Sequence, residues 1–319
     1  MDLLSYKPQK EFAQKHMLRL SDYTPDEILQ VLSLALKLKK QKKEGLMPPL
    51  LDGKILAMIF TKSSTRTRVS FEAGIYQLGG TGQFLSSNDI QLGRGEPISD
   101  TAQVLSRMVD GIMIRTFAQS DVDDLAKYGS IPVINGLTDL LHPCQILADL
   151  MTYFEHKSSF SGKLAYIGDG NNVANSLLVG CAKLGLDITV ACPDGFEPNS
   201  NVLASAKAAA KQSDSKIIIT DDPRTAAQDA DAVYTDVWAS MGQESDAAEK
   251  YQHFTKYQVN DDLLSLCKDD VIFLHCLPAH RGEEVTAEVI DGPHSVVFDE
   301  AENRLHAQKA VMALLMGAK

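Results

Sequence analysis

Short apolar runs alternate with helix-length stretches along almost the whole of this chain. The runs that we interpret as strands cover residues 54–60, 82–87, 111–117, 131–136, 163–169, 187–193, 216–222, 232–238, 271–278 and 296–300. Continuous runs of valine, isoleucine and leucine that are separated by helices are typical of buried parallel strands in βαβ units. The sequence shows no repeat of roughly 20–50 residues, which would indicate a solenoid. The pattern therefore predicts an α/β fold with parallel sheets.

The length of the chain and a polar break near its middle indicate two domains. At about 150 residues per domain, 319 residues correspond to roughly two. The strand runs form two sets on either side of the polar segment 156–163, and each set predicts a doubly wound parallel sheet. We place the boundary in or beside the helix that follows His142, so that interdomain helices join the domains. A last amphipathic helix is predicted from about Glu302 to Met316.

Charge and composition exclude several classes of protein. Lysine and arginine number 31 against 42 aspartates and glutamates, so the net charge is −11 and a general nucleic-acid binder is not expected. No run approaches the ~18 apolar residues of a membrane-spanning helix. The first residues are too polar for a secretory signal, and Asp2 and Glu11 argue against a transit peptide. We therefore expect a cytoplasmic enzyme that binds neither membranes nor nucleic acid.

The most specific chemical signal is Thr-Lys-Ser-Ser-Thr-Arg-Thr-Arg at 61–68, which follows a predicted strand and begins a helix. The first turn of a helix binds anions through its free N–H groups, and Ser64 suits the N-cap position. Lys62, Arg66 and Arg68 are cations at the helix end where each is unfavourable by ~0.3–1 kcal/mol. Three cations at an unfavourable helix end favour a phosphate ligand over a solvated basic turn. The nucleotide-binding pattern GxxxxGK[ST] is absent.

A glycine loop at 168–172 also follows a predicted strand, as a dinucleotide site would. The loop lacks the third glycine of GxGxxG. The next strand ends at 190–193 in Val-Ala-Cys-Pro, without the acidic residue that holds a ribose. We therefore expect no NAD.

Two further motifs are ambiguous when each is taken alone. Residues 142–145 (His-Pro-Cys-Gln) predict a helix start, where the imidazole can donate to a carbonyl oxygen and the glutamine can recognise an NH2 group. A simple helix cap explains this motif equally well. Residues 236–242 (Asp-Val-Trp-Ala-Ser-Met-Gly) bring a carboxylate, a hydroxyl and a glycine to a strand end, as a site for an ammonium group requires. A strand-end turn is the alternative.

The cysteines indicate neither a disulfide framework nor a zinc site. All five are scattered without a CxxC pair, which is typical of reduced thiols. Cys276, in the His-Cys-Leu-Pro motif at 275–278, is predicted at the carboxyl end of a strand, where open α/β sheets place their ligands. Inert packing is the alternative for a buried cysteine. His275 and His280 form no ligand pattern with Cys276, so we expect no metal.

Taken together, the motifs at 64–68, 142–145 and 275–278, in that order, resemble those of the aspartate/ornithine carbamoyltransferase family. The motif at 236–242 is similar to that of the ornithine-using members of the family. The resemblance covers essentially the whole chain. It implies transfer of the carbamoyl group from carbamoyl phosphate to the δ-amine of L-ornithine, which gives L-citrulline and phosphate.

The resemblance also implies an organisation for the molecule. Residues 1–150 are expected to bind carbamoyl phosphate, with the C-terminal helix, about 302–319, packed back on this domain. Residues 151–301 are expected to bind ornithine. A homotrimer is implied as well, with no cofactor and no metal, and the Leu277–Pro278 bond is expected to be cis.

Individual residues follow from the matched motifs. The resemblance implies catalytic roles for Arg66, Arg115, His142, Asp236 and Cys276. It implies contacts to carbamoyl phosphate from Ser64, Thr65, Arg66, Thr67, Gln91, Arg115, His142, Gln145, Cys276, Leu277 and Arg304. Among these, Gln91 is expected to reach in from a neighbouring subunit. Contacts to ornithine are implied for Asn172, Asp236, Ser240 and Met241.

Other functions remain open at this level. A putrescine-using enzyme should lack the Ser-Met-Gly of 240–242, because putrescine has no α-carboxylate. An aspartate-using enzyme typically has His-Pro-Leu-Pro and an arginine where this chain has 275–278. A non-catalytic sensor of carbamoyl phosphate or an amino acid belongs to a different class, and the filled catalytic positions argue against it. The polar segment 240–257 is a candidate mobile loop over a site.

Overall fold

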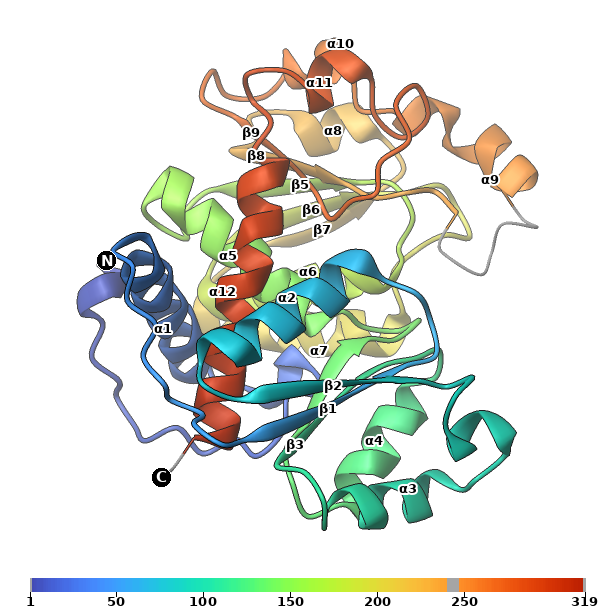
Figure 1. Ribbon diagram of the computed structural model, residues 1–319. Coiled ribbons are helices and arrows are strands. Elements are labelled where there is room, and N and C mark those ends of the chain that lie inside the picture. The colour runs from blue at the N-terminus through green and yellow to red at the C-terminus, as the bar shows by residue number, and fades with distance from the viewer. Residues whose placement is uncertain (1, 240–246, 318–319) are drawn as a thin grey trace. The chain divides into compact units, whose positions relative to one another are not determined.

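Two parallel sheets, one of four strands and one of five, organise the chain (Figure 1). The computed structural model describes residues 2–239 and 247–317. These residues form two units, of which unit 1 comprises Met1–Met151 with Glu302–Lys319 and unit 2 comprises Thr152–Ala301. The predicted α/β class with two parallel-sheet units is confirmed.

Unit 1 contains a sheet with the strand order β2-β1-β3-β4. Its strands are β1 (Ile55–Phe60), β2 (Thr81–Ser86), β3 (Gly111–Arg115) and β4 (Val133–Leu137). Its helices and 3-10 turns are η1 (Leu3–Ser5), η2 (Leu20–Asp22), α1 (Pro25–Lys43), α2 (Thr65–Gln77), η3 (Gln91–Arg94), α3 (Ile98–Leu105) and α4 (Gln119–Tyr128). Because β1 and β3 are buried almost throughout, they are continuous apolar runs in the sequence.

Unit 2 contains a sheet with the strand order β7-β6-β5-β8-β9. Its strands are β5 (Lys163–Ile167), β6 (Asp187–Ala191), β7 (Ile217–Thr220), β8 (Ala232–Thr235) and β9 (Ile272–His275). Its helices and 3-10 turn are α6 (Asn172–Leu184), α7 (Ser200–Ser213), α8 (Pro223–Ala227), α9 (Ala247–Phe254), η5 (Thr255–Tyr257), α10 (Asp261–Leu264) and α11 (Ala287–Ile290). The rings of Tyr166 and Tyr234 stack at 5.9 Å on the neighbouring strands β5 and β8.

Two long helices belong to both units. Helix α5 (Pro143–Lys157) begins in unit 1, and α12 (Val297–Met316) begins in unit 2 and ends in unit 1. Because α12 returns to unit 1 from Glu302 onward, it supplies that unit with residues distant in sequence. Within the described residues, no helix is long and apolar enough to cross a membrane.

Helix ends follow from capping residues in the sequence. Helix α1 begins with a capping box, in which Thr24 Oγ1 accepts a hydrogen bond from the Glu27 N–H at 3.2 Å and Glu27 Oε2 accepts one from the Thr24 N–H at 2.8 Å. Helix α6 begins after Asn171 and ends at Gly185, whose φ of 80° lies in the left-handed region. Capping residues in the sequence therefore account for the start of α1 and for both ends of α6.

The structure differs from the sequence analysis in two segments. Residues 296–300 were expected to form a strand because of their two valines, but Val297 begins α12, whose first turn carries the acidic Asp299 and Glu300. Of the expected loop at 240–257, residues 240–246 lie outside the described residues, and the rest is α9 and η5. Lys250 on α9 forms an ion pair with Asp169 at 2.5 Å.

Candidate active site

In unit 1, the order of the strands reverses between β1 and β3, which is where ligands bind in open parallel sheets. Phe60 at the end of β1 is in register with Arg115 at the end of β3. The next N–H along the chain, that of Thr61, donates to the carbonyl oxygen of Arg115 at 2.9 Å. The loop that leads into α2 therefore begins beside Arg115, at the same edge of the sheet.

Helix α2 begins as the sequence predicts. Ser64 is its N-cap, and the Ser64 hydroxyl accepts from the Thr67 N–H at 3.1 Å. Two of the nearby cations are compensated by carboxylates of the chain, since Lys62 pairs with Asp139 and Arg68 pairs with Glu72. The positive charge that could bind an anion therefore comes from the arginines whose charges act on His142.

We call Arg66, Arg115 and Arg304 the arginine cluster. The Thr67 hydroxyl accepts from Arg115 Nη1 at 3.4 Å and from Arg304 Nη2 at 3.3 Å. Arg115 is 8% exposed and Arg304 is 3% exposed. Guanidinium groups are fixed positive charges whose planar N–H donors suit carboxylate and phosphate groups. The convergence of Arg115 and Arg304 on Thr67, in the first turn of α2, indicates an anion site.

His142 immediately precedes α5, and the charges of the arginine cluster act on its imidazole. Burial lowers the pKa of His142 well below its ordinary value, and the positive charges of Arg304, Arg115 and Arg66 lower it further. The imidazole is therefore neutral at physiological pH, with one ring nitrogen as donor and the other as acceptor. Pro143 occupies the first position of α5, as predicted. A neutral donor among three cations suits a carbonyl oxygen that gains negative charge.

The other residues expected at this site differ in their placement. The Gln145 side chain accepts from Arg304 Nη1 at 2.6 Å, so it joins the arginine cluster. Thr65 is exposed in the first turn of α2. Gln91 is exposed on η3, and the described residues include no hydrogen bond between Gln91 and the arginine cluster.

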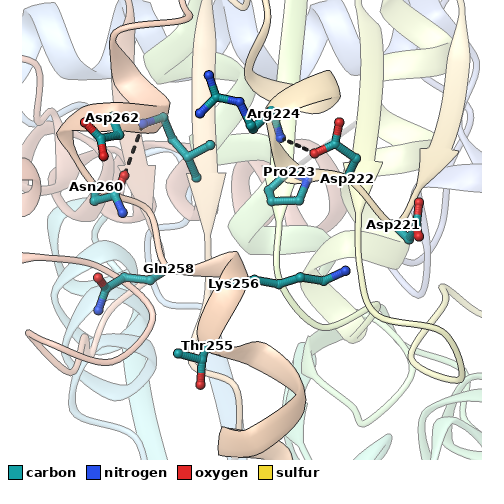
Figure 2. Close-up of a pocket in the computed structure, with 10 residues that line it drawn as sticks. Asp221, Asp222, Pro223, Arg224, Thr255, Lys256, Gln258, Asn260 and Asp262 are labelled. Atoms are coloured by element: carbon teal, nitrogen blue, oxygen red, sulfur yellow. Dashed lines mark hydrogen bonds between the residues drawn. The ribbon is translucent and has the colours of Figure 1, made fainter.

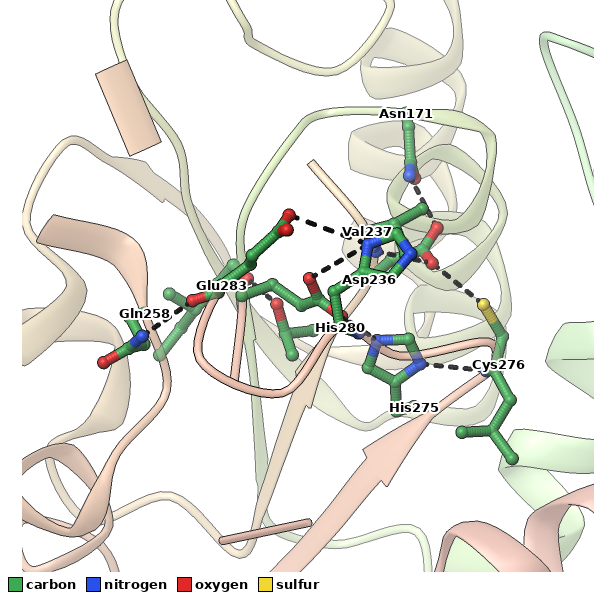
Figure 3. A network of polar contacts seen from close by, with 12 residues as sticks. Asn171, Asp236, Val237, Gln258, His275, Cys276, His280 and Glu283 are labelled. Atoms are coloured by element: carbon green, nitrogen blue, oxygen red, sulfur yellow. Dashed lines mark hydrogen bonds and ion pairs between the residues drawn. The ribbon is translucent and has the colours of Figure 1, made fainter. Parts of the chain in front are cut away.

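In unit 2, strand register brings Asp236 and Cys276 together (Figure 3). Thr235 of β8 is in register with His275 of β9, so the next residue of each strand continues at the same edge of the sheet. The Cys276 thiol donates to Asp236 Oδ1 at 3.0 Å. Asp236 also accepts from the Val237 N–H at 2.8 Å. The Asp236–Cys276 contact places a carboxylate and a thiol at one point.

Asn171 is a member of this site that the sequence analysis missed. Its Nδ2 donates to Asp236 Oδ2 at 2.7 Å (Figure 3). Its Oδ1 accepts from the Val173 N–H at 2.9 Å and so caps α6. Asn172, the expected ligand contact, is the first residue of α6. An asparagine immediately before an apolar helix is an N-cap signal, and this signal in the sequence identifies Asn171.

The segment after β9 is held by buried acids. His275 Nδ1 accepts from the Leu277 N–H at 2.9 Å, so the ring proton is on Nε2, which faces Glu284 Oε1 at 3.3 Å. The His275 N–H donates to Glu300 Oε2 at 2.9 Å. Leu277 has a φ of 55°, and the Leu277–Pro278 bond is cis, as the resemblance implied. Glu284 and Glu300 are fully buried and were not expected from the sequence.

Among the residues that the structure describes, two groups of three side chains have ligand atoms within 4.8 Å of one another, a spacing that a metal ion could use. They are Asp236, His275 and Cys276, and His280, Glu283 and Glu284. The first group differs from the sequence analysis, in which His275 formed no ligand pattern with Cys276. Both ring nitrogens of that histidine are engaged, by the Leu277 N–H and by Glu284. In the second group, Glu284 Oε1 accepts from the His280 N–H and faces His275. We therefore assign no metal to either group.

A polar cavity of about 440 Å³ lies elsewhere in unit 2 (Figure 2). It adjoins the end of β7, which β6 and β5 separate from β8. Its polar side chains stabilise helix ends, since Asp222 accepts from the Arg224 N–H at 3.0 Å and Asn260 accepts from the Leu263 N–H at 3.1 Å. We assign no ligand to this cavity. Ser240 and Met241, which were expected to bind ornithine, lie outside the described residues.

Comparisons with known proteins match both units of the chain. The family model "aspartate/ornithine carbamoyltransferase, carbamoyl-P binding domain" matches residues 15–155, and the corresponding "Asp/Orn binding domain" matches residues 161–315. The ornithine carbamoyltransferase of Oceanobacillus iheyensis is 62% identical over 309 residues, which cover 97% of this chain and 96% of that protein. That of Carboxydothermus hydrogenoformans is 59% identical over 304 residues, covering 95% and 98%.

A solved structure gives the same result. The ornithine carbamoyltransferase from Pyrococcus furiosus superposes with a TM-score of 0.94 at 54% identity, covering 97% of this chain and all of that one. The resemblance that the sequence motifs indicated is therefore confirmed. This chain belongs to the aspartate/ornithine carbamoyltransferase family.

Proposed function

We propose that this chain transfers the carbamoyl group of carbamoyl phosphate to the δ-amine of L-ornithine, which gives L-citrulline and phosphate. The observation that supports this function best is the arginine cluster around a neutral His142, because an acyl phosphate presents both a dianion and a carbonyl oxygen. Relatives named ornithine carbamoyltransferase, at about 60% identity, support ornithine as the acceptor.

In the proposed complex, unit 1 supplies most of the contacts to carbamoyl phosphate. We assign these contacts to Ser64, Thr65, Arg66, Thr67, Gln91, Arg115, His142, Gln145, Cys276, Leu277 and Arg304. The phosphate accepts from the N–H groups in the first turn of α2, whose partial positive charge also stabilises phosphate as the leaving group. The carbonyl oxygen, which becomes an oxyanion, accepts from Arg66, Arg115 and His142. Gln145 recognises the NH2 group.

The acceptor amine attacks the carbonyl carbon directly, and the bond from that carbon to the phosphate oxygen breaks. We assign the α-amino and α-carboxylate contacts of ornithine to Asn172, Asp236, Ser240 and Met241. A lysine-like amine with a pKa of ~10.4 is ~3 units from neutrality at pH 7, which corresponds to ~4–5 kcal/mol. Asp236 and Cys276, which are joined by a hydrogen bond of 3.0 Å, are the proposed groups that orient the amine and receive its proton.

The purified chain should form citrulline from carbamoyl phosphate and L-ornithine, and turnover with putrescine or L-aspartate should be at least ~100-fold slower. Putrescine has no α-carboxylate and leaves the partners of that group unpaired, whereas L-aspartate has no δ-amine to attack the carbonyl carbon. The measurement is a side-by-side assay of the three amines at equal concentration. Preference for putrescine would reassign the acceptor, and binding of carbamoyl phosphate without turnover of any amine would favour a sensor.

We propose a homotrimer whose active site includes Gln91 of a neighbouring subunit. Exposed apolar side chains in unit 1 support such an interface. Val69 and Tyr76 are seven residues apart and share one face of α2, which packs on β2. Phe84 is exposed on β2, an edge strand of the sheet. A shared site also explains why Gln91, on an exposed turn, does not contact the arginine cluster of its own unit.

Mixing two inactive variants, Arg66→Ala and Gln91→Ala, should restore activity. After dissociation and reassembly, some interfaces of a hybrid trimer combine an intact Arg66 with an intact Gln91, whereas neither parent contains such an interface. The measurement is citrulline formation by hybrids whose composition is verified by native mass spectrometry. Mixing Arg66→Ala with Arg115→Ala is the matched control, because both residues belong to one unit and no complete site can form. Verified hybrids of the first mixture that remain inactive would show that both residues serve the same subunit.

We also propose that the reaction takes place in the cytoplasm. All five cysteines carry free thiols, three of them buried. Reduced cysteines without a disulfide framework are typical of proteins in a reducing compartment.

A further inference from the structure

Gln308 is a buried amide on α12, one helical turn after Arg304. Its exposed fraction is 0%. Residues four apart on a helix are neighbours, so the two side chains can meet. Neither the motifs nor the proposed mechanism uses Gln308. A buried amide is expensive unless its two N–H groups and its oxygen are hydrogen-bonded, so its partners show what it does.

The Gln308 amide has partners for both N–H groups and for both lone pairs of its oxygen, all in unit 1. The guanidinium of Arg304 can only donate, so the amide oxygen faces it and accepts from Nη2 at 2.9 Å and from Nε at 3.2 Å. The amide nitrogen donates to the Ser70 hydroxyl on α2 and to the Arg304 carbonyl oxygen, the latter at 3.3 Å. Rotating the amide by 180° would oppose its N–H groups to those of the guanidinium. The amide is therefore fixed with its oxygen toward Arg304.

The Ser70 hydroxyl extends these contacts to the first turn of α2. It donates to the Arg66 carbonyl oxygen at 2.6 Å, while its lone pairs can accept from Gln308. A chain of hydrogen bonds therefore runs from the guanidinium of Arg304 on α12 to the backbone of Arg66 on α2. Both arginines belong to the arginine cluster, so Gln308 joins two of its members.

Gln308 contacts the charge of Arg304 without cancelling it. An amide accepts hydrogen bonds but is neutral, whereas a carboxylate at the same place would compensate the guanidinium. Two other contacts of Arg304 are also with neutral groups, since Nη1 donates to Gln145 at 2.6 Å and Nη2 donates to Thr67 at 3.3 Å. The positive charge of Arg304 acts within the site, where it lowers the pKa of His142.

We propose that Gln308 is a positioning residue that holds the guanidinium of Arg304 for carbamoyl phosphate and leaves its positive charge available to that ligand. The proposal rests on the proposed function, in which Arg304 contacts carbamoyl phosphate. Gln145 and Thr67 contact the two terminal nitrogens of the guanidinium, whereas Gln308 also contacts Nε and so spans a second edge of the plane. Loss of this edge should weaken binding of the ligand, and a negative charge at the same place should weaken it more.

The experiment compares the assembled wild-type enzyme with Gln308→Met and Gln308→Glu. The quantities measured are the Kd of carbamoyl phosphate, the Kd of inorganic phosphate and the KM for ornithine at saturating carbamoyl phosphate. In Gln308→Met, which removes the amide at similar size, we expect the Kd of carbamoyl phosphate to rise about fivefold, as expected for one hydrogen bond. Gln308→Glu keeps an acceptor but adds a negative charge, so the Kd of both ligands should rise at least about tenfold. The KM for ornithine should stay within about twofold of the wild type in both variants, since Arg304 is not assigned to that substrate.

A double-mutant cycle with Arg304→Met tests whether Gln308 acts through Arg304. If it does, adding Gln308→Met to the Arg304→Met enzyme should change the Kd of carbamoyl phosphate by less than about twofold. Gln103→Glu is the matched control for charge, because it adds a carboxylate at an exposed position of α3 in the same unit and should leave all three constants unchanged. Gln308→Ala uses the best helix former and repeats the test if Gln308→Met does not fold.

Two outcomes overturn the positioning role of Gln308. The first is an unchanged Kd of carbamoyl phosphate in a folded Gln308→Met or Gln308→Glu enzyme, when Arg304→Met does bind the ligand weakly. The second is an equal effect of Gln308→Met with and without Arg304, which indicates that Gln308 only supports the packing of α12. An Arg304→Met enzyme that binds carbamoyl phosphate like the wild type would instead contradict the contact given to Arg304 in the proposed function.

Discussion

Replacing Arg66 with alanine should weaken the binding of carbamoyl phosphate by roughly 100-fold to 10,000-fold, since a bidentate guanidinium–phosphate contact contributes two charge-assisted bonds of ~1.5–3 kcal/mol each. Arg66 lies in the first turn of α2, and its charge acts on the buried His142. Without ligand, the same change should slightly raise thermal stability. A cation at a helix N-terminus costs ~0.3–1 kcal/mol, and the variant removes this cost.

Ligand binding and melting temperature together test this prediction. Titration with carbamoyl phosphate gives the affinity, and thermal unfolding with and without ligand gives the two stabilities. Arg107→Ala is the matched control, because it removes an exposed arginine of the same unit that lies outside the site. Arg66→Lys keeps the charge but loses the planar fork, so its affinity should be intermediate. Near-normal activity of Arg66→Ala would contradict the phosphate site.

Much of unit 1 could be predicted from the sequence because its signals are local. The apolar run of β1, the N-cap Ser64 and the proline after His142 each determine the conformation of a few neighbouring residues. What local patterns could not provide is the pairing of charges. Lys62 and Arg68 appeared to belong to the anion site, yet each is compensated by a carboxylate, and one of these, Asp139, is distant in the sequence. Such pairs depend on the tertiary fold.

Arg304 and Gln145 illustrate the opposite case. Their contact joins residues 159 positions apart, and only the resemblance to a family placed Arg304 near the ligand. Helix α12 makes this contact possible, and its start was predicted incorrectly because Val296 and Val297 suggested a strand. The acidic first turn was the better signal. The strand propensity of valine is a weak guide at a helix end, because burial and capping also determine the conformation there.

In unit 2, the sequence indicated where Asp236 and Cys276 lie, but not what holds them. The carboxyl ends of parallel strands meet at one edge of a sheet, so both residues were predictable as site candidates. The buried Glu284 and Glu300 were not, since acids in a polar segment are usually solvated. Glu300 accepts from the backbone N–H of His275, and Glu284 faces Nε2 of its ring, so this ring nitrogen is engaged rather than available to a metal.

Asp236→Asn should lower turnover and raise the KM for ornithine, each by roughly 10-fold to 100-fold. The change removes a charge-assisted interaction of ~1.5–3 kcal/mol with the substrate ammonium. It also disturbs two contacts of the carboxylate, since Asp236 accepts from Asn171 at 2.7 Å and from Cys276 at 3.0 Å. An asparagine amide has only one acceptor oxygen, so it cannot satisfy both donors through separate oxygens. Control of the amine should therefore be lost together with affinity.

Cys276→Ser separates the two roles of this pair. Serine still donates to Asp236, but it cannot ionise near the ordinary thiol pKa of about 8.5. We therefore expect slower turnover and a changed pH profile, with little change in the affinity for carbamoyl phosphate, whose phosphate contacts are assigned to unit 1. Cys267→Ser is the matched control: burial raises the pKa of the Cys267 thiol to about 11, so this group does not titrate between pH 6 and 9.

The decisive measurement is the pH dependence of kcat and of the ornithine KM for the wild type and the three variants. A carboxylate that only binds the substrate changes KM more than the shape of the profile, whereas a group that receives the proton changes the profile of kcat. Because Asp236 and Cys276 share a hydrogen bond, their effects should not be additive in the double variant. If both single variants match the wild type in both parameters from pH 6 to pH 9, this pocket does not bind the amine, and the assignment of ornithine loses its chemical basis.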